Sequence, residues 1–185
     1  PIVIDFDLAD GNQQQQRTFI SGAGERVELQ LHAEDVQQIS GWSILLRYDP
    51  DQLAYVGGSF VPGDFIPGLL GLASQTDDAI EVGGTVLGTD ATGDGDGWLG
   101  SLAFDVLEGF SFSSSLVIEE VKLRVPGMGR LKQSVDSRGV LSAATPDLPS
   151  GPIVLDLDEA PGDQGARRLE GVDAGDRVAM ELYVE

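Results

Sequence analysis

The sequence predicts an all-β protein, a sandwich of two antiparallel sheets, and three observations lead to that class. Strand-like segments recur at short intervals, separated by clusters of Gly, Pro, Asp and Ser. Glycine is abundant, with 25 among 185 residues, and apolar positions seldom repeat with the helical period. Two segments alternate apolar and polar residues, as strands with one buried face do. Because helical patterns are scarce, a sandwich is favoured over a mixed α+β fold.

Eight candidate strands follow from this alternation and from the turn residues between them. They are residues 2–8, 26–33, 41–48, 53–60, 80–89, 98–107, 116–125 and 138–142. Their short, regular spacing is typical of a sandwich. Segment 61–75, "VPGDFIPGLLGLASQ", fits neither strand nor helix well, and we expect it to hold one short helical turn.

The pleat is clearest in segments 41–48 and 98–107. Their core-facing residues are predicted to be Trp42, Ile44, Leu46 and Tyr48 in the first, and Trp98, Leu102, Phe104 and Val106 in the second. The two tryptophans could instead form a platform for stacking sugars. Since both lie on apolar faces, we predict that they belong to the core.

The beginning of the chain recurs near its end. Residues 152–185 align without gaps over residues 1–34, at an offset of 152 − 1 = 151. Identical pairs include Asp5 with Asp156 and Arg26 with Arg177. We therefore predict a module at 1–142, a linker at 143–151, and the truncated start of a second repeat at 152–185.

The predicted second copy has an apolar stripe and too few strands to bury it. The stripe consists of Val178, Met180, Leu182 and Val184. An isolated hairpin is marginal in water, so the stripe must be covered by the first module or by a neighbouring chain. We expect the neighbouring chain, in a strand-swapped or strand-added homodimer through residues 152–185, with strands at 153–158 and 177–184.

Composition excludes several classes of function. The chain has no Cys, so it offers no disulfide framework, thiol nucleophile or Cys-bound metal. No apolar run is long enough for a membrane span. With 31 acidic and 11 basic residues, the net charge is −20, which argues against nucleic acid as a partner. This acidity fits either a high-salt or calcium-rich setting or an extracellular protein kept soluble by charge.

Four stretches of the chain carry a family resemblance. They are "ISGWSILLRYDPDQLAYVGGSFVPGDFI" at 39–66, "DGDGWLGSLAFDV" at 94–106, "SLVIEEVKL" at 115–123 and "SRGVLS" at 137–142. These stretches resemble cohesin domains, the extracellular jelly-roll β-sandwiches that bind dockerins. The resemblance covers roughly residues 3–142. It implies a jelly-roll fold, a dockerin-like protein partner and a non-catalytic role.

The sequence departs from the family pattern on the strand that ends in Tyr48-Asp49-Pro50. Cellulosomal cohesins carry an Asn and an Asp there, two residues apart, which receive hydrogen bonds from the dockerin. Anchoring on "YDP" puts Gly41 and Ser43 at those places. The partner-binding face is therefore predicted to comprise Gly41, Ser43, Leu45 and Arg47, an apolar residue flanked by a hydroxyl and a cation.

A possible calcium site lies in "TDATGDGDGW". Asp90, Asp94 and Asp96 fall within eight residues, and the intervening glycines permit tight turning. The segment lacks the EF-hand pattern, since Ser101 occupies the place of the bidentate Glu. The alternative is a solvated hairpin loop, because Asp-Gly is common between strands. Asp5, Asp7 and Asp10 are instead expected on the outward face of an edge strand.

The sequence contains no recognisable arrangement of catalytic residues. His32 is the single histidine and is expected at the surface, and no Ser-His or His-metal arrangement is present. We therefore predict a non-enzymatic, extracellular or cell-surface interaction module used in tandem. The alternatives are a structural or adhesive spacer repeat that binds mainly its neighbours, and a carbohydrate-binding module.

Overall fold

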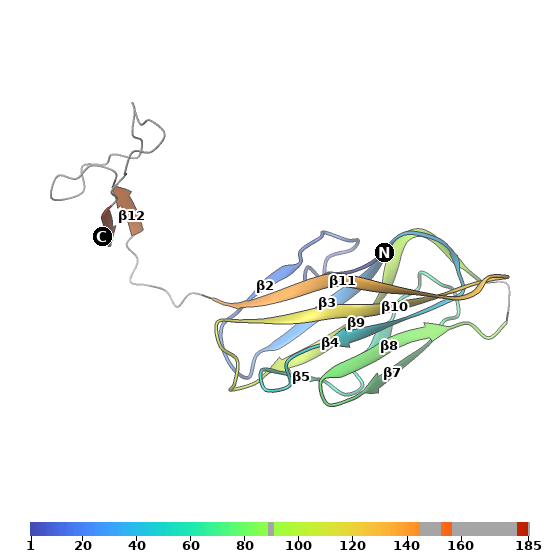
Figure 1. Ribbon diagram of the computed structural model, residues 1–185, viewed down its shortest axis with the longest axis horizontal. Coiled ribbons are helices and arrows are strands. Elements are labelled where there is room, and N and C mark those ends of the chain that lie inside the picture. The colour runs from blue at the N-terminus through green and yellow to red at the C-terminus, as the bar shows by residue number, and fades with distance from the viewer. Residues whose placement is uncertain (89–90, 145–152, 157–180, 185) are drawn as a thin grey trace, which may run out of the picture. The chain divides into compact units, whose positions relative to one another are not determined.

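The computed structural model describes residues 1–88, 91–144, 153–156 and 181–184 of the chain. Contacts divide the chain into two compact units, Pro1–Ala144 and Thr145–Glu185. Within the described residues every regular element is a β-strand (Figure 1). The predicted all-β class is confirmed for the first unit, which forms two sheets.

The first sheet has five strands built around two long ones. Its strands are β1 (Ile2–Asp5), β3 (Arg26–Ile39), β9 (Gly93–Val106), β5 (Leu53–Tyr55) and β6 (Val61–Pro62). Their order is β1-β3-β9-β5, and β6 also pairs with β9. All of these pairs are antiparallel. The sheet thus depends on the long β3–β9 ladder.

The second sheet has six strands in the order β2-β11-β10-β4-β8-β7. They are β2 (Arg17–Ile20), β11 (Gly129–Ala143), β10 (Ser113–Val125), β4 (Gly41–Arg47), β8 (Ala79–Thr85) and β7 (Leu70–Gln75). Four of the five pairs are antiparallel, but β2 runs parallel to β11. The predicted antiparallel pairing is therefore wrong at this one edge, where the opening and closing segments of the first unit meet.

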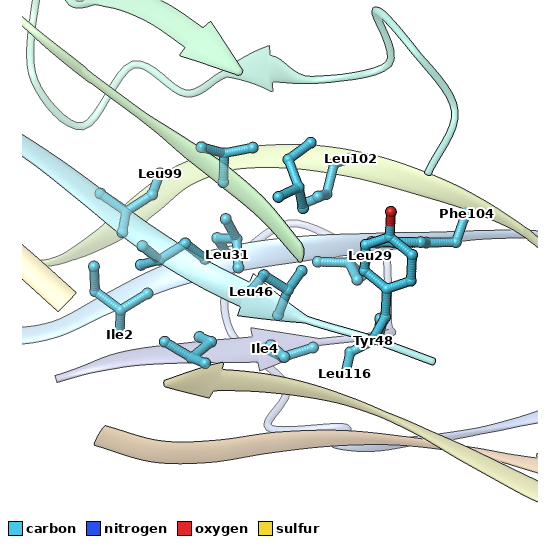
Figure 2. Packing of buried hydrophobic residues seen from close by; sticks show 14 of the residues in the cluster. Ile2, Ile4, Leu29, Leu31, Leu46, Tyr48, Leu99, Leu102, Phe104 and Leu116 are labelled. Atoms are coloured by element: carbon cyan, nitrogen blue, oxygen red, sulfur yellow. The ribbon is translucent and has the colours of Figure 1, made fainter. Parts of the chain in front are cut away.

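A single apolar layer fills the space between the sheets (Figure 2). The alternation predicted for residues 41–48 is confirmed, because the core residues on β4 and just after it are at most 5% exposed: Trp42, Ile44, Leu46 and Tyr48. Leu29 and Leu31 of β3 face them from the other sheet and are fully buried. Burying one such side chain contributes about 1.5–3 kcal/mol, so this layer is the main source of stability.

On β9 the predicted alternation is right only for part of the strand. Leu102, Phe104 and Val106 are buried as expected, but further back the buried residue is Leu99 rather than Trp98, which is half-exposed. The register with β3 shifts at this point, and Gly100 has φ of +145°. A bulge therefore changes which side of the strand faces inward.

The remaining differences from the predicted elements lie in β2, β6 and β7. No strand was predicted at Arg17–Ile20, and the helical turn expected in 61–75 is absent from the described residues of that segment. Two strands occupy its ends instead, β6 and β7. Both lie at sheet edges, where less apolar area is buried and alternation is correspondingly weak.

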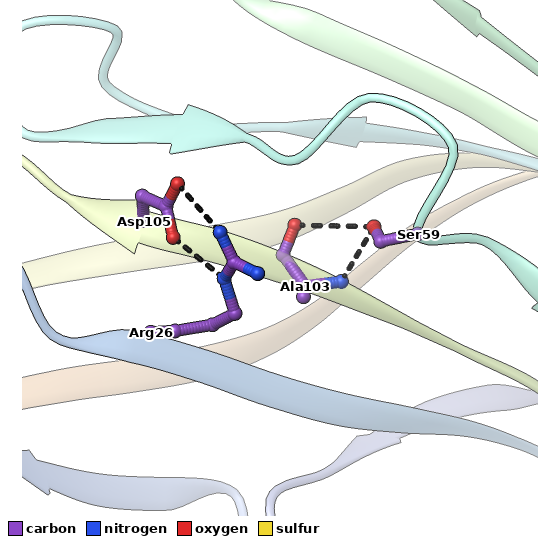
Figure 3. Close-up of polar contacts among 4 residues, drawn as sticks. All are labelled: Arg26, Ser59, Ala103 and Asp105. Carbon is purple, nitrogen blue, oxygen red and sulfur yellow. Dashed lines mark hydrogen bonds and ion pairs between the residues drawn. The ribbon is translucent and has the colours of Figure 1, made fainter.

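Polar side-chain contacts reinforce the attachment of neighbouring segments to β9 (Figure 3). Arg26 donates from Nε and Nη2 to the two carboxylate oxygens of Asp105, at 2.8 and 3.1 Å, directly across the β3–β9 ladder. Ser59 Oγ accepts from the Ala103 amide at 3.0 Å. Together with the 3.0 Å bond from the Val56 amide to the Ala103 carbonyl, this contact attaches the chain between β5 and β6 to β9.

Asp5 is buried, so its predicted place on an outward face is wrong. The residue is fully inaccessible and accepts hydrogen bonds from the amides of Asp7, Gln13, Gln14 and Gln15 at 2.5–3.2 Å. Four charge-assisted bonds compensate for the lost hydration of the carboxylate. Asp5 thus holds the loop that follows β1.

His32 is also buried, contrary to the surface position predicted from the sequence. Its exposed fraction is 2%, and its neighbours across the ladders are Val3 and Trp98. One ring nitrogen lies 2.9 Å from Gln30 Oε1. Burial lowers the pKa of the imidazole, so the neutral ring is favoured.

The second unit contains β12 (Ile153–Asp156) and β13 (Glu181–Val184), which pair antiparallel. Ile153 pairs with Val184 and Asp156 with Glu181. When 151 is subtracted from these residue numbers, the pairs become Ile2 with Ala33 and Asp5 with Gln30. These are the pairs that join β1 to β3. Leu182 and Val184 of the predicted apolar stripe lie on β13. The rest of the predicted strands, Val178 and Met180, and the 145–151 part of the predicted linker lie outside the described residues.

Replacing Asp5 should destabilise the first unit strongly. Asp5→Ala removes one acceptor for four amides, and we expect a loss of about 2–4 kcal/mol in the free energy of unfolding, measured by urea denaturation. Asp7→Ala is the matched control, because Asp7 accepts one bond, from Ala9. We expect it to cost less than about 1 kcal/mol. Equal losses for the two variants would contradict the assigned role.

The predicted homodimer through 152–185 is tested by sedimentation. We expect the full chain to show concentration-dependent dimerisation and a chain ending at Ala144 to stay monomeric, because the two strands predicted for the second repeat are too few to bury their own apolar stripe. A full chain that remains monomeric over the same concentrations would contradict the prediction.

Candidate functional site

The predicted partner-binding residues share the outer face of β4. Because side chains alternate along a strand, the inward Ile44 and Leu46 leave Gly41, Ser43, Leu45 and Arg47 on the side away from the core. Ser43, Leu45 and Arg47 are each half-buried. The structure therefore brings the four residues together, at the centre of the six-stranded sheet.

A polar ladder crosses this face beside Ser43. Ser43 Oγ donates to Glu81 Oε1 at 3.0 Å, and Lys122 Nζ donates to the same oxygen at 2.8 Å. Lys122 also lies 3.2 Å from Glu120, which pairs in turn with Lys132. Lys122 holds the pKa of Glu81 below its usual value, and Lys132 does the same for Glu120. Both carboxylates are therefore ionised at neutral pH.

Arg47 closes the other end of the face. Its guanidinium forms ion pairs with Asp78 and, at 2.7 Å, with Glu119, and these hydrogen bonds raise its pKa. Leu45 lies between Glu81 and Glu120 in the ladders. The guanidinium of Arg47 is thus already ion-paired within its own chain, and toward Gly41 the outer face of β4 itself carries no charged side chain.

A groove of about 360 Å³ opens at this end of β4, and we call it the β4 groove. Its lining includes Gly41, Ser43, Leu72, Gly83 and Thr85, together with the charged residues Glu81, Lys122, Arg124 and Arg130. Glycines form its floor because the strands come close here. A Cβ at Gly83 would lie 2.2 Å from the Trp42 carbonyl oxygen, and one at Gly41 would lie 2.9 Å from Thr85 Oγ1.

The cations beside the groove were missed by the sequence analysis. Lys122 and Arg124 lie two residues apart on β10, and Arg130 and Lys132 lie two residues apart on β11. The turn between the strands places Lys122 opposite Lys132 and Arg124 opposite Arg130. In the sequence, the spacing of these basic residues by two on either side of "VPGMG" is the pattern that indicates the cluster. Of the eight basic residues in 1–144, seven lie on strands of the six-stranded sheet: Arg17, Arg47, Lys122, Arg124, Arg130, Lys132 and Arg138.

The predicted calcium ligands are only partly described. Asp90 lies outside the described residues, and Asp94 and Asp96 belong to β9 rather than to a hairpin loop. Each carboxylate accepts a hydrogen bond from a backbone amide of β3, in the part where the register between β3 and β9 shifts. Asp94 accepts from Gln38 at 3.1 Å and Asp96 accepts from Asp35 at 2.7 Å. The part of the chain that is described contains no cluster of three metal-ligating side chains.

The glycines of the same segment have a packing role. A Cβ at Gly93 or Gly97 would lie within 2.5 Å of the Phe65 ring. That ring therefore packs directly on the β9 backbone, which only glycine permits at these two positions. The "GDGDG" stretch thus joins β9 to β3 through its carboxylates and to Phe65 through its glycines.

The tryptophan predicted for the core on β4 is confirmed there. Trp42 is 3% exposed and meets Phe60 edge-to-face, with ring centroids 6.1 Å apart. Its ring is therefore not free to stack on a sugar. No helix long and apolar enough to cross a membrane occurs among the described residues.

Solved structures share this fold, whereas the sequence alone finds no match to a protein-family model or to a curated protein. One is a cohesin module of a Clostridium perfringens family 33 glycoside hydrolase, at 12% identity, covering 77% of this chain and 94% of the other, with a TM-score of 0.57. Another is the sixth cohesin of Acetivibrio cellulolyticus scaffoldin B in complex with a dockerin, at 15% identity, 77% and 97% coverage, and a TM-score of 0.58.

A non-cellulosomal cohesin from the archaeon Archaeoglobus fulgidus matches at 15% identity, with 67% and 84% coverage and a TM-score of 0.53. At identities this low, the comparisons show a shared fold and nothing more. The chain contains a cohesin-like domain, a jelly-roll β-sandwich, and the resemblance seen in the sequence is confirmed.

Calcium binding at Asp90, Asp94 and Asp96 stays a prediction. We expect millimolar calcium to raise the melting temperature by mass action, and Asp96→Asn to remove that calcium-dependent rise. Asp64→Asn, an acid outside the segment, is the control and should keep the rise. An unchanged melting temperature of the unaltered chain in calcium would contradict the prediction.

Proposed function

We propose that residues 1–144 form a non-catalytic protein-interaction module that binds a dockerin-like partner through the outer face of β7, β8, β4 and β10. The observation that carries the proposal is the β4 groove, which lies on the outer face of the strand where the cohesin resemblance puts partner contacts. Solved cohesins of the same fold include complexes with dockerins.

The partner must present different contact groups to this face than a cellulosomal dockerin does. Gly41 and Ser43 supply one hydroxyl where the family pattern has an amide and a carboxylate, and that hydroxyl is already bonded to Glu81. Recognition therefore shifts toward the groove floor and the cations on β10 and β11. A shape-filling contact suits the recess that the glycines leave.

We also propose that the module is used in tandem and outside the cell. The support for repetition is the β12–β13 register, which reproduces the β1–β3 register at an offset of 151. The extracellular setting follows from the cohesin resemblance, and the net charge of −20 suits a protein that stays soluble there.

Binding of purified dockerin modules, measured by isothermal titration calorimetry, tests this function. Ser43→Arg should fill the groove and weaken binding about thirtyfold or more, the cost of a central interface residue. Glu28→Arg adds the same side chain to the outer face of the other sheet, where Glu28 is exposed, and should leave affinity unchanged. Failure of every dockerin to bind, or equal effects of the two variants, would contradict the proposal.

A further inference from the structure

Arg124 and Arg130 form a like-charge pair without an acidic partner. They lie directly opposite each other on β10 and β11. Neither has a carboxylate within ion-pair distance among the described residues, although Arg26, Arg47, Lys122 and Lys132 all do. Like charges directly across a ladder destabilise a sheet. In a chain with 31 acidic residues, an uncompensated arginine pair needs a reason other than folding.

The Arg124 side chain is held in place over the groove. Its Nη1 donates to Thr85 Oγ1 at 3.0 Å, across the intervening strand at Gly41. The missing side chain at Gly41 leaves the guanidinium room to lie there. One donor is used by Thr85, and the remaining guanidinium donors have no carboxylate to meet among the described residues. The group is therefore positioned in advance for a planar acceptor.

The opposite rim of the groove is apolar. Leu70 and Leu72 of β7 are 52% and 76% exposed, and both project on the outer face beside Thr85 and Gly83. Neighbouring strands lie about 4.8 Å apart, so the leucines stand roughly 5–10 Å from the guanidinium held over Gly41. The face thus offers a cationic site and an apolar rim at a fixed separation.

We infer that Arg124 and Arg130 bind a carboxylate of the partner, from a protein segment that also places an apolar side chain against Leu70 and Leu72. The inference rests on the proposed function and names the chemistry of the partner. A guanidinium and a carboxylate form two parallel hydrogen bonds, and a second guanidinium beside them offsets the charge further. Acid and apolar side chains two residues apart in an extended segment lie on the same side, about 6.6 Å from each other, which is within the required separation.

A second copy of this chain fits the site less well than a separate acidic segment. Two copies with a net charge of −20 repel each other at long range, and the dimer predicted through residues 152–185 depends on strand pairing there and not on the β4 groove. A short acidic segment contributes far less repulsion and can reach the isolated cationic site. The occupant is therefore a carboxylate-bearing segment of another protein.

The probe is the peptide acetyl-Glu-Glu-Gly-Leu-Leu-amide, titrated into the isotope-labelled full chain and followed by NMR. We expect saturable shifts at Gly41, Gly83 and the side-chain Nε resonances of Arg124 and Arg130. The peptide with Gln in place of both Glu should bind at least about tenfold more weakly, since it loses the charge-assisted bonds. Equal binding of the two peptides, or no saturable binding, would overturn the inference.

Matched variants separate this site from general electrostatic attraction. Arg124→Gln with Arg130→Gln should lower the peptide affinity about tenfold or more. Arg17→Gln should not change it, although Arg17 is likewise an exposed arginine of the same sheet without an ion pair among the described residues. Equal losses in the two proteins would overturn the inference. So would shifts at Gly41 and Gly83 that grow with protein concentration alone, because the occupant would then be a second copy.

A stability measurement distinguishes binding from folding as the reason for the pair. Arg130→Glu places opposite charges across the ladder, so it should raise the melting temperature while abolishing peptide binding. A lowered melting temperature would show that the arginines serve the fold and would overturn the inference. If Ser43→Arg weakens dockerin binding but Arg124→Gln with Arg130→Gln leaves the dockerin affinity unchanged, the proposed function stands and this inference alone is wrong.

Discussion

Burial of Ile44 and Leu46 between the sheets fixes the register of β4, and that register determines which side chains reach the outer face. Strand side chains alternate with a period of two, so a slip by one residue would bury Ser43 and Leu45 and expose the core positions. The loss of buried apolar area would cost several kcal/mol, by roughly 1.5–3 kcal/mol per side chain. The recognition surface is therefore held by the core beneath it.

The two sheets divide the charges of the first unit unequally. Strands of the five-stranded sheet carry one basic residue, Arg26, which is paired with Asp105. Five of the other seven lie on β10 and β11, and three of these, Lys122, Arg124 and Arg130, line the β4 groove. An acidic protein with a local cationic site at Arg124 and Arg130 can reject most acidic surfaces at long range and still accept an acidic segment that reaches this site.

Predictions from the sequence were right where alternation is long and uninterrupted. Residues 41–48 and 102–106 follow the period of two, and their core residues were assigned correctly. The predictions were wrong for Trp98 and Leu99, because a bulge at Gly100 reverses the alternation. They were also wrong for Asp5 and His32, whose burial depends on amides and rings from other segments. A polar residue type alone does not reveal such partners.

The sequence by itself determined the fold class, the core of β4, the cohesin resemblance and the position of Gly41 and Ser43 on the outward face, because each depends on local alternation or on a motif. Only the tertiary structure decided that Gly83, Leu72 and Thr85 line a groove beside them. Only it placed Arg124 opposite Arg130 and over Gly41. These residues come from β7, β8, β10 and β11, and strand pairing sets their proximity through register and bulges that are fixed when the sheets assemble.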